Sequence, residues 1–357
     1  MSKAISSLPV GAKVKDTGTT YYGSPIIWQV ADKNHSGYPA NSVTLVAANI
    51  LKIAAFDAKE SGNSDSNRRS YGNNRYALSN IRQWLNKSGS PWYVAQHSAD
   101  ATPSSGNVSY NPYDGQSGFL TDFSAQMKAA LLDTTLTVAK ATVDGGGSES
   151  VVDKVFLLSK QEVGLGSENS IAEGSLLALF SSDNSSRLCK PTANAVSNST
   201  YTSSNLSASQ NWWWWLRSPY SSNSNDVRSV YAVGSSIDYY AYGGYGGVRP
   251  ALNLSSGILV SDSADSDGAY TIVWNQAPTP PPSITVPETI RSGKGAVITW
   301  AGSTDPEGGA VSYELERKIN SGSAAARTRY NGASGRRTTS AHTAATSRAR
   351  AELSSIM

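Results

Sequence analysis

Apolar and polar residues alternate in several short stretches of this chain, whereas helical spacing is rare. Ile26, Trp28 and Val30 share one face at a period of two, which predicts a strand. Residues 43–47 predict its partner, because the turn-forming run that starts at His35 lies between them. Such scattered short strands indicate a sheet assembled from segments that are distant in the sequence.

Two windows have apolar residues at helical spacing, residues 80–86 and residues 122–132. Ser79 or Asn80 can cap the first of these helices. The combination predicts a mixed α+β fold in which mostly antiparallel strands accompany short helices.

Four consecutive tryptophans, Trp212 to Trp215, cannot all face one side of a strand. Alternation places Trp212 and Trp214 on one face and the other two on the opposite face. A strand buried on both faces satisfies this pattern, and a partly exposed sugar-stacking platform is the alternative. Residues 227–233 and 237–242 follow as two β-forming runs joined by Gly234 and two serines, which predicts a hairpin.

The hairpin region, residues 220–247, has an unusual composition. It holds six tyrosines and no Phe, Trp, Lys, Glu or Leu, and Ser, Asn, Asp and Gly fill most other positions. Tyr supplies rigid amphipathic contact area while Ser, Gly and Asn supply adaptable hydrogen bonds, as in antibody paratopes. A ligand-binding surface is our interpretation, and a solvated hairpin without a partner is the alternative. The candidate ligand-binding residues are Tyr220, Asn223, Asn225, Asp226, Tyr231, Asp238, Tyr239, Tyr240, Tyr242 and Tyr245.

The sequences that flank this region resemble an uncharacterised domain family of gut bacteria and their prophages. The resemblance rests on Trp-Trp-Leu-Arg-Ser-Pro at 214–219 and Gly-Val-Arg-Pro-Ala-Leu-Asn-Leu at 247–254, and it covers residues 5–273. Some members resemble the variable proteins of diversity-generating retroelements. That resemblance implies a C-type-lectin-like fold, of the kind shared with formylglycine-generating enzymes, and a variable hairpin at 220–247. The structural frame of the hairpin would be Trp212, Trp214, Arg217, Arg249 and Asn253.

The chain changes character after residue 273. A Pro-rich linker is expected at 274–283. Residues 284–320 resemble the first strands of a fibronectin type III module, an incomplete β-sandwich with Trp300 as its core aromatic residue. Residues 321–357 form a basic, low-complexity tail, for which a frameshift and genuine disorder are the two explanations.

Charge and motifs exclude several functions. The net charge of +3 comes from the end of the chain, since residues 1–316 carry 22 basic and 26 acidic groups. That balance argues against a nucleic-acid partner. The single cysteine, Cys189, cannot form an intrachain disulfide, and neither a metal nor a cofactor is expected. No signal peptide and no apolar run long enough to span a membrane is visible. The chain lacks the common hydrolase, P-loop and zinc motifs, and His35 and His97 are expected in surface loops.

These observations predict a binding protein rather than an enzyme. The leading hypothesis is a phage or prophage tail-associated receptor-binding protein, located in the virion tail, extracellularly or at the cell surface. Its partners would be a host surface protein or glycan and other virion tail proteins. A bacterial surface adhesin and a cell-wall-active enzyme are the alternatives.

Overall fold

The computed structural model divides the chain into two compact units, residues 1–273 and 274–357. The structure describes residues 2–274, 281–285, 295–303, 312–318, 324–331, 335–340 and 351–352.

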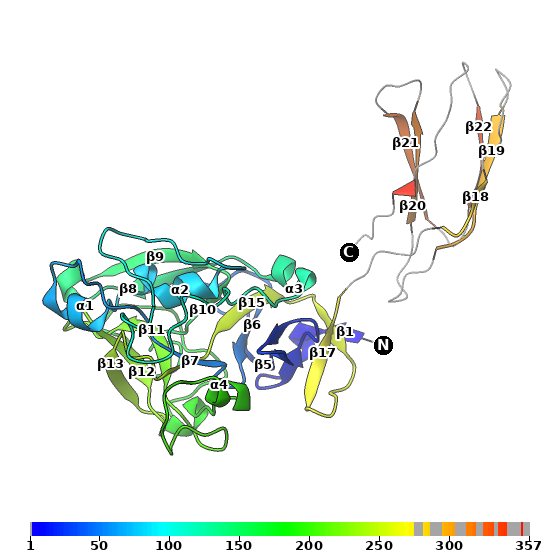
Figure 1. Cartoon of the computed structure of the whole chain (residues 1–357). Coiled ribbons are helices and arrows are strands. Elements are labelled where there is room, and N and C mark those ends of the chain that lie inside the picture. Colours follow the sequence, from blue (N-terminus) through cyan, green and yellow to red (C-terminus); the bar gives the residue numbers. More distant parts are fainter. Residues whose placement is uncertain are drawn as a thin grey trace. The chain divides into compact units, whose positions relative to one another are not determined.

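An eight-stranded sheet runs through the first unit, in the order β1-β16-β17-β2-β5-β6-β15-β10 (Figure 1). Its neighbours are antiparallel except for β17 and β2, which are parallel. The centre of the sheet is its most buried part, because β6 has no exposed residue. The strands are β1 (Ser2–Ala4), β2 (Lys13–Lys15), β5 (Trp28–Lys33), β6 (Ser42–Ala47), β10 (Val155–Phe156), β15 (Ala251–Ser255), β16 (Leu259–Ser261) and β17 (Ala269–Val273).

A five-stranded sheet, in the order β13-β12-β11-β14-β7, carries the hairpin region. Strands β12 and β13 form the hairpin, and β13 is an edge strand. The strands are β7 (Lys52–Ala54), β11 (Trp214–Pro219), β12 (Asp226–Val230), β13 (Ser236–Tyr240) and β14 (Gly246–Val248). Two separate ribbons pair β3 (Thr20–Tyr21) with β4 (Ser24–Pro25) and β8 (Thr134–Ala139) with β9 (Ser148–Asp153).

The predicted α+β, C-type-lectin-like fold is wrong, because the structure is β-rich, with 28% strand and 13% helix. The α-helices have only five or six residues each: α1 (Ser66–Tyr71), α2 (Asn80–Leu85), α3 (Ala125–Ala130) and α4 (Ala193–Ser197). Short 3-10 helices lie at Ile5–Ser7, Tyr76–Leu78, Thr142–Asp144 and Asn184–Arg187. The helix predicted at 122–132 begins only after its cap, Ser124, and ends where Leu131 becomes extended and leads into β8. Four apolar residues at helical spacing therefore marked one turn and its flanks rather than a full helical layer.

Other local predictions are confirmed. Strands β5 and β6 pair antiparallel, with Trp28 opposite Ala47. Ser79 caps α2 by accepting a hydrogen bond from the Arg82 N–H (3.4 Å). The hairpin forms with Val230 opposite Ser236. No helix among the described residues is long and apolar enough to cross a membrane.

The described strands of the second unit form two three-stranded sheets, ordered β18-β19-β22 and β21-β20-β23. Strand β19 pairs with β22 and β20 with β21, so strands from either side of residue 320 pair with each other. The segments between these strands, and most of the expected linker at 274–283, lie outside the described residues. The strands are β18 (Ile284–Thr285), β19 (Gly295–Trp300), β20 (Ser312–Lys318), β21 (Ala324–Asn331), β22 (Gly335–Ser340) and β23 (Ala351–Glu352).

Candidate binding surface

The consecutive tryptophans end in strand β11, which contains Trp214 and Trp215 and lies under the hairpin region. Trp214 and Trp215 are fully buried, and their indole N–H groups donate to the carbonyl oxygens of Arg187 (3.2 Å) and Ala54 (2.8 Å). Trp213 lies on the same face as Trp215, with ring centroids 4.9 Å apart. The strand is therefore buried on both faces, as the alternation predicts, and is not an open stacking platform.

Arg217 fixes the end of β11 to the segment at 157–173. Its Nη1 donates to Glu162 Oε2 (2.6 Å) and to the Leu157 carbonyl (3.0 Å), and its Nη2 donates to Glu162 Oε1 (2.7 Å) and to the Glu173 carbonyl (2.6 Å). Both members of the pair are almost completely buried. Burial alone would lower the pKa of Arg217, but the Glu162 carboxylate outweighs it, so the pKa is raised. The two side chains form a buried ion pair that clamps β11 to this segment.

The other end of the hairpin region is held in a similar way. Arg249 Nε donates to the Ala47 carbonyl (2.9 Å), and its guanidinium lies 5.0 Å from the ring centre of Trp214. Asn253 is buried and accepts a hydrogen bond from Thr44 Oγ1 (2.6 Å). The expected frame residues therefore fix the ends of the hairpin region from inside the unit.

The loop that leaves β13 is tied to three other segments. The Tyr242 N–H donates to the Tyr71 carbonyl (2.9 Å), and the Ser109 N–H donates to the Tyr242 carbonyl (3.1 Å). The indole of Trp212 donates to the Tyr245 carbonyl (2.8 Å). These bonds hold the backbone of the loop, so its tyrosine rings are displayed from a fixed support.

Two glycines in this loop are required by close approach. A Cβ at Gly244 would lie 1.8 Å from the Tyr110 carbonyl oxygen, and one at Gly246 would lie 2.3 Å from the Trp215 ring. Neither neighbour is the end of a flexible side chain. The two glycines therefore let the backbone of the loop pack closely against Tyr110 and against the ring of Trp215.

One group of rings lies on the tryptophan side of β13. Tyr239 stacks on Trp213, with centroids 4.3 Å apart and planes at 21°. The ring centroid of Tyr245 lies 5.6 Å from that of Trp213 and 5.7 Å from that of Tyr239. It lies 5.5 Å from the ring centroid of Tyr201. Tyr201 in turn meets Tyr110 edge-on at 5.0 Å. The result is a continuous row of aromatic contacts from β13 to two distant loops.

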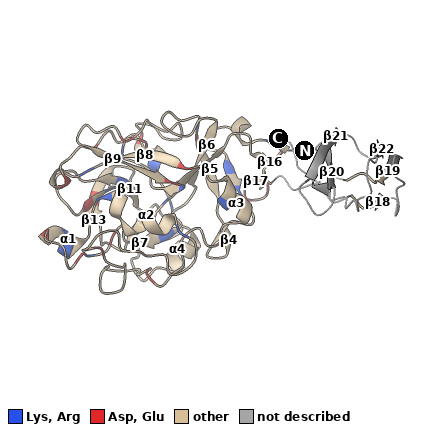
Figure 2. Cartoon of the chain, turned by 90° about the horizontal axis from the view of Figure 1, so that it is seen from above, with Lys and Arg blue, Asp and Glu red and all other residues tan. Residues whose placement is uncertain are grey.

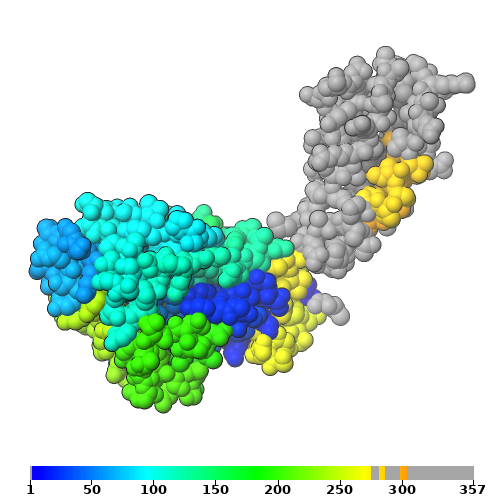
Figure 3. Space-filling view, in the orientation of Figure 1, coloured from blue at the N-terminus to red at the C-terminus, as the bar shows by residue number. Residues whose placement is uncertain are grey.

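A second group lies beside α1. Tyr240 stacks on Tyr71, with centroids 4.3 Å apart and planes at 16°. Tyr242 lies 5.9 Å from Tyr71, and Lys59 Nζ is 4.7 Å from the centre of the Tyr242 ring. In Figure 3 the light blue of the segment around α1 adjoins the yellow-green of the hairpin region at one end of the first unit.

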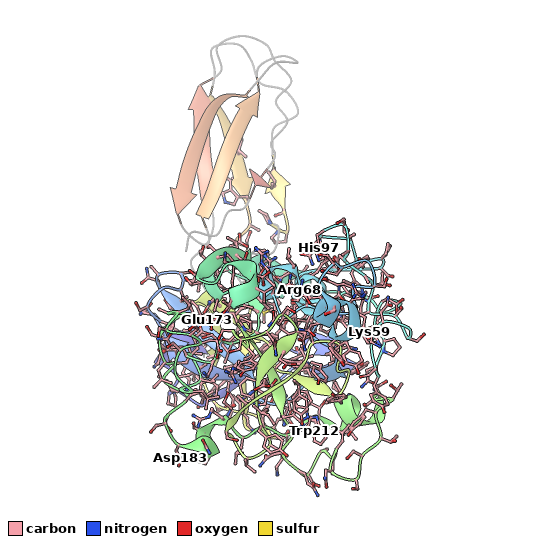
Figure 4. All side chains as sticks on the ribbon, turned by 90° about the vertical axis from the view of Figure 1, so that its left-hand side faces the viewer. Lys59, Arg68, His97, Glu173, Asp183 and Trp212 are labelled. Carbon is pink, nitrogen blue, oxygen red and sulfur yellow. The ribbon has the colours of Figure 1, made fainter. Side chains whose placement is uncertain are left out.

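We call the two groups together the aromatic surface: Tyr71, Tyr110, Tyr201, Tyr239, Tyr240, Tyr242 and Tyr245. Tyr110 and Tyr240 are each 42% exposed, and the other members are partly exposed. Burial raises the pKa of Tyr245 to about 12, so its hydroxyl stays neutral at physiological pH. In Figure 4, which faces this end of the unit, Lys59 lies on one side of the face and Asp183 on the other. The surface offers ring faces and neutral hydroxyls.

Three candidate residues shape a turn instead of contributing rings. Asn223 Oδ1 accepts from the Asp226 N–H (2.8 Å), and Asn225 Nδ2 donates to Asp226 Oδ1 (2.9 Å). The buried Asn74 side chain donates to the carbonyls of Asn223 and Asp226, both at 3.0 Å. The polar groups of this turn are thus largely used in holding β11 and β12 together, and Asn225 is itself buried.

The remaining candidates are dispersed. Tyr220 lies under the Arg228 guanidinium at 4.3 Å, and Arg228 also pairs with Asp238 (3.1 Å). Tyr231 is 39% exposed in the hairpin turn. Because neighbouring residues of a strand point to opposite faces, Tyr239 and Tyr240 belong to different groups. The tyrosines therefore wrap around the edge of β13 rather than projecting from one face.

Sequence reasoning missed Tyr71, Tyr110, Tyr201 and Lys59. Each belongs to a segment that is distant from the hairpin in the sequence, and none has a local pattern that separates it from an ordinary loop residue. The backbone bonds of Tyr242 bring the segments of Tyr71 and Tyr110 to the hairpin. Tyr201 and Lys59 meet it through the rings of Tyr245 and Tyr242.

The described residues contain no group of three or more His, Cys, Asp or Glu side chains that could hold a metal ion. Cys189 is buried, and burial raises the pKa of its thiol. His35 is buried, contrary to expectation, with Nε2 3.0 Å from the Ser175 carbonyl. Figure 2 shows basic and acidic positions interspersed along the first unit.

Lys52 on β7 is a buried cation enclosed by rings. Its Nζ contacts Gln116 Oε1 (2.5 Å) and lies 5.4 and 5.6 Å from the ring centres of Trp84 and Tyr113. Within the described part of the chain it makes no salt bridge. Burial lowers its pKa to about 7. The rings and the amide stabilise an amine that water no longer solvates.

Residues 41–256 match the family described as Domain of unknown function (DUF6273), and the chain belongs to this family. The match includes β6, β15 and β10 of the eight-stranded sheet and all five strands of the sheet that carries the hairpin region. No curated protein and no solved structure matches the chain.

Proposed function

We propose that the first unit is a binding module that recognises a host surface protein or glycan through the aromatic surface. The observation that carries this proposal is the gathering of seven tyrosines, in two groups on either side of β13, on a hydrogen-bonded support, with Tyr110 and Tyr240 each 42% exposed. Gathered, exposed aromatic groups are unusual on a surface without a partner. Tyr is enriched among the residues that dominate binding energy.

The broader role in this proposal is that of a phage or prophage tail-associated receptor-binding protein. Its support is the resemblance of the flanking sequences at 214–219 and 247–254 to prophage proteins and to variable proteins of diversity-generating retroelements. The frame and the rings are separable in this unit: Arg217 and Arg249 are buried, while the rings lie at the edge of a sheet. Such a division lets surface residues change while the frame stays folded.

The test is binding of the fluorescently labelled chain to a panel of gut bacterial species, measured by flow cytometry, and to a glycan array. Tyr110→Ala combined with Tyr240→Ala removes one exposed ring from each group. We expect the loss of at least tenfold in affinity, since each dominant ring contributes about 1–3 kcal/mol. The variant should stay folded, because both side chains are substantially exposed.

The matched control is Tyr270→Ala, which removes a partly exposed tyrosine from β17 of the eight-stranded sheet, outside the aromatic surface. It should bind as the unaltered chain does. Equal losses in the control and in the double variant, or no loss in either, would contradict the proposal. Release of soluble fragments from purified peptidoglycan by the chain would favour a cell-wall-active enzyme instead.

A further inference from the structure

Strand β13 is the unpaired edge of the five-stranded sheet, and it runs between the two groups of rings (Figure 1). Its five residues pair with β12 in one continuous antiparallel register, from Val230 opposite Ser236 to Asp226 opposite Tyr240. The other side of the strand has no strand partner among the described residues.

The register shows which backbone groups face outward. At one end of the ladder the Tyr231 N–H donates to the Ser235 carbonyl, and at the other the Ala241 N–H donates to the Asn225 carbonyl, both at 2.8 Å. Hydrogen-bonded and non-hydrogen-bonded pairs alternate in an antiparallel ladder. Ser236, Asp238 and Tyr240 therefore occupy non-hydrogen-bonded pairs.

The N–H and C=O groups of these three residues point away from β12. The Tyr240 carbonyl accepts from the Gly243 N–H (2.9 Å). The described residues provide no hydrogen-bond partner for the backbone groups of Ser236 and Asp238 or for the Tyr240 N–H. These groups form a free hydrogen-bonding edge of the kind to which an extended peptide adds as a further strand.

We propose that the aromatic surface takes an extended polypeptide segment of its partner, which adds to β13 as a sixth strand with a basic residue opposite Asp238. This inference rests on the proposed binding function and narrows its ligand from a surface protein or glycan to a polypeptide. The backbone edge supplies hydrogen bonds that a polypeptide matches in register.

The side chains beside the edge define the sequence of the incoming strand. Ile237 and Tyr239 lie on the tryptophan side, so the partner's residues on that side are apolar. Asp238 and Tyr240 lie on the opposite side, where Tyr240 stacks on Tyr71. The segment therefore alternates apolar residues with one basic residue at the position facing Asp238.

Charge is the reason for a basic residue. An aspartate on an edge strand opposes the pairing of neutral or acidic strands. Arg228 reaches Asp238 at 3.1 Å, but Arg228 also pairs with Glu168 (2.8 Å), and the Asp238 side chain remains 37% exposed. Lys160 also pairs with Glu168 (3.1 Å), so Arg228 and Lys160 together face Glu168 and Asp238. Asp226 interacts with Asp238 as a third carboxylate, which leaves the cluster with more acidic than basic groups. A Lys or Arg of the incoming strand completes the balance at Asp238.

The experiment selects binders of the full chain from a displayed library of random twelve-residue peptides and measures synthetic copies by fluorescence polarisation. Asp238→Pro and Ser236→Pro each remove one outward N–H without touching the ladder to β12, since proline is tolerated on the solvent side of edge strands. Asp238→Asn is the matched control, because it keeps the N–H and removes only the charge. Thermal unfolding verifies that each variant folds. If Asp238→Pro does not fold, Ser236→Pro alone tests whether the loss of an outward N–H weakens binding.

We expect the enriched peptides to alternate apolar residues with a Lys or Arg and to lose at least tenfold in affinity for the proline variants. The Asn control should lose severalfold, and its loss should shrink at high salt. N-methylation of single peptide residues should abolish binding only at every second position, because only every second N–H of the added strand faces β13. The inference is overturned if the proline variants bind enriched peptides as the unaltered chain does, or if the library yields no binder.

The failure of this inference is distinguishable from failure of the proposed function. If bacterial cells or glycans bind the Asp238→Pro variant normally but not the Tyr110→Ala/Tyr240→Ala variant, the aromatic surface binds a ligand without strand addition. If cell binding survives the double tyrosine variant, the proposed function itself fails.

Discussion

Replacing Arg217 by Met removes the cation of the buried clamp and should destabilise the first unit strongly. The change deletes four hydrogen bonds, two to Glu162 and two to the carbonyls of Leu157 and Glu173. It leaves the Glu162 carboxylate buried with two donors, the Tyr38 hydroxyl (2.6 Å) and the Ser159 N–H (2.9 Å). Breaking one side of a buried ion pair typically costs about 3–5 kcal/mol.

That loss is large beside the total stability of a domain, about 5–15 kcal/mol. Urea unfolding followed by tryptophan fluorescence measures it, because Trp214 and Trp215 of the same strand are buried. Glu162→Gln and the double variant complete a thermodynamic cycle, and we expect the double variant to be less destabilised than the sum of the single changes.

The pH dependence of the variant is a second measurement of the same effect. An unpaired buried carboxylate has a raised pKa, so the folded variant binds a proton more readily than the unfolded chain. The contribution of this carboxyl group to the stability of the variant is then greatest at acid pH. That contribution falls as pH rises above about 4.3, the pKa of the carboxyl group in the unfolded chain. The deficit of Arg217→Met should therefore be smaller at pH 4.5 than at pH 7. The clamp would be refuted if Arg217→Met lowered the free energy of unfolding by less than about 1 kcal/mol at pH 7 and its effect simply added to that of Glu162→Gln.

Three further predictions concern single positions. Because the pKa of Lys52 falls to about 7 in the folded chain, the unfolded chain holds more protons between pH 7 and about 10.4; the free energy of unfolding should rise with pH in that window, by up to about 1.4 kcal/mol per pH unit. Urea unfolding between pH 7 and 9 should show that Lys52→Met removes this slope, and identical slopes would contradict it. Gly244→Ala places a Cβ 1.8 Å from the Tyr110 carbonyl and should lower the melting temperature by several degrees, whereas Gly257→Ala, whose nearest neighbour is 3.9 Å away, should not. Asn74→Ala leaves the turn carbonyls of Asn223 and Asp226 without their donor and should cost about 1–3 kcal/mol in urea unfolding; an unchanged midpoint would show that water replaces the amide.

The sequence by itself determined features that depend on near neighbours. The alternation in β5 and β6, the Ser79 cap, the hairpin and the burial of β11 on both faces follow from side-chain period and turn chemistry within a few residues. Arg217 and Arg249, which the family resemblance named as frame residues, are buried. The composition of residues 220–247 indicated where the tyrosines would gather.

Only the tertiary structure decided the balance of strand and helix and the make-up of the aromatic surface. Short apolar windows with helical spacing also occur around single helical turns, so the pattern at 122–132 could not give the length of α3. Tyr71, Tyr110 and Tyr201 meet Tyr240 or Tyr245 through ring contacts that span from 44 residues (Tyr201–Tyr245) to 169 residues (Tyr71–Tyr240) of chain, which no local pattern encodes. Alternation along a strand already puts Tyr239 and Tyr240 on opposite faces, but long-range packing decides that one face meets Trp213 and the other meets Tyr71.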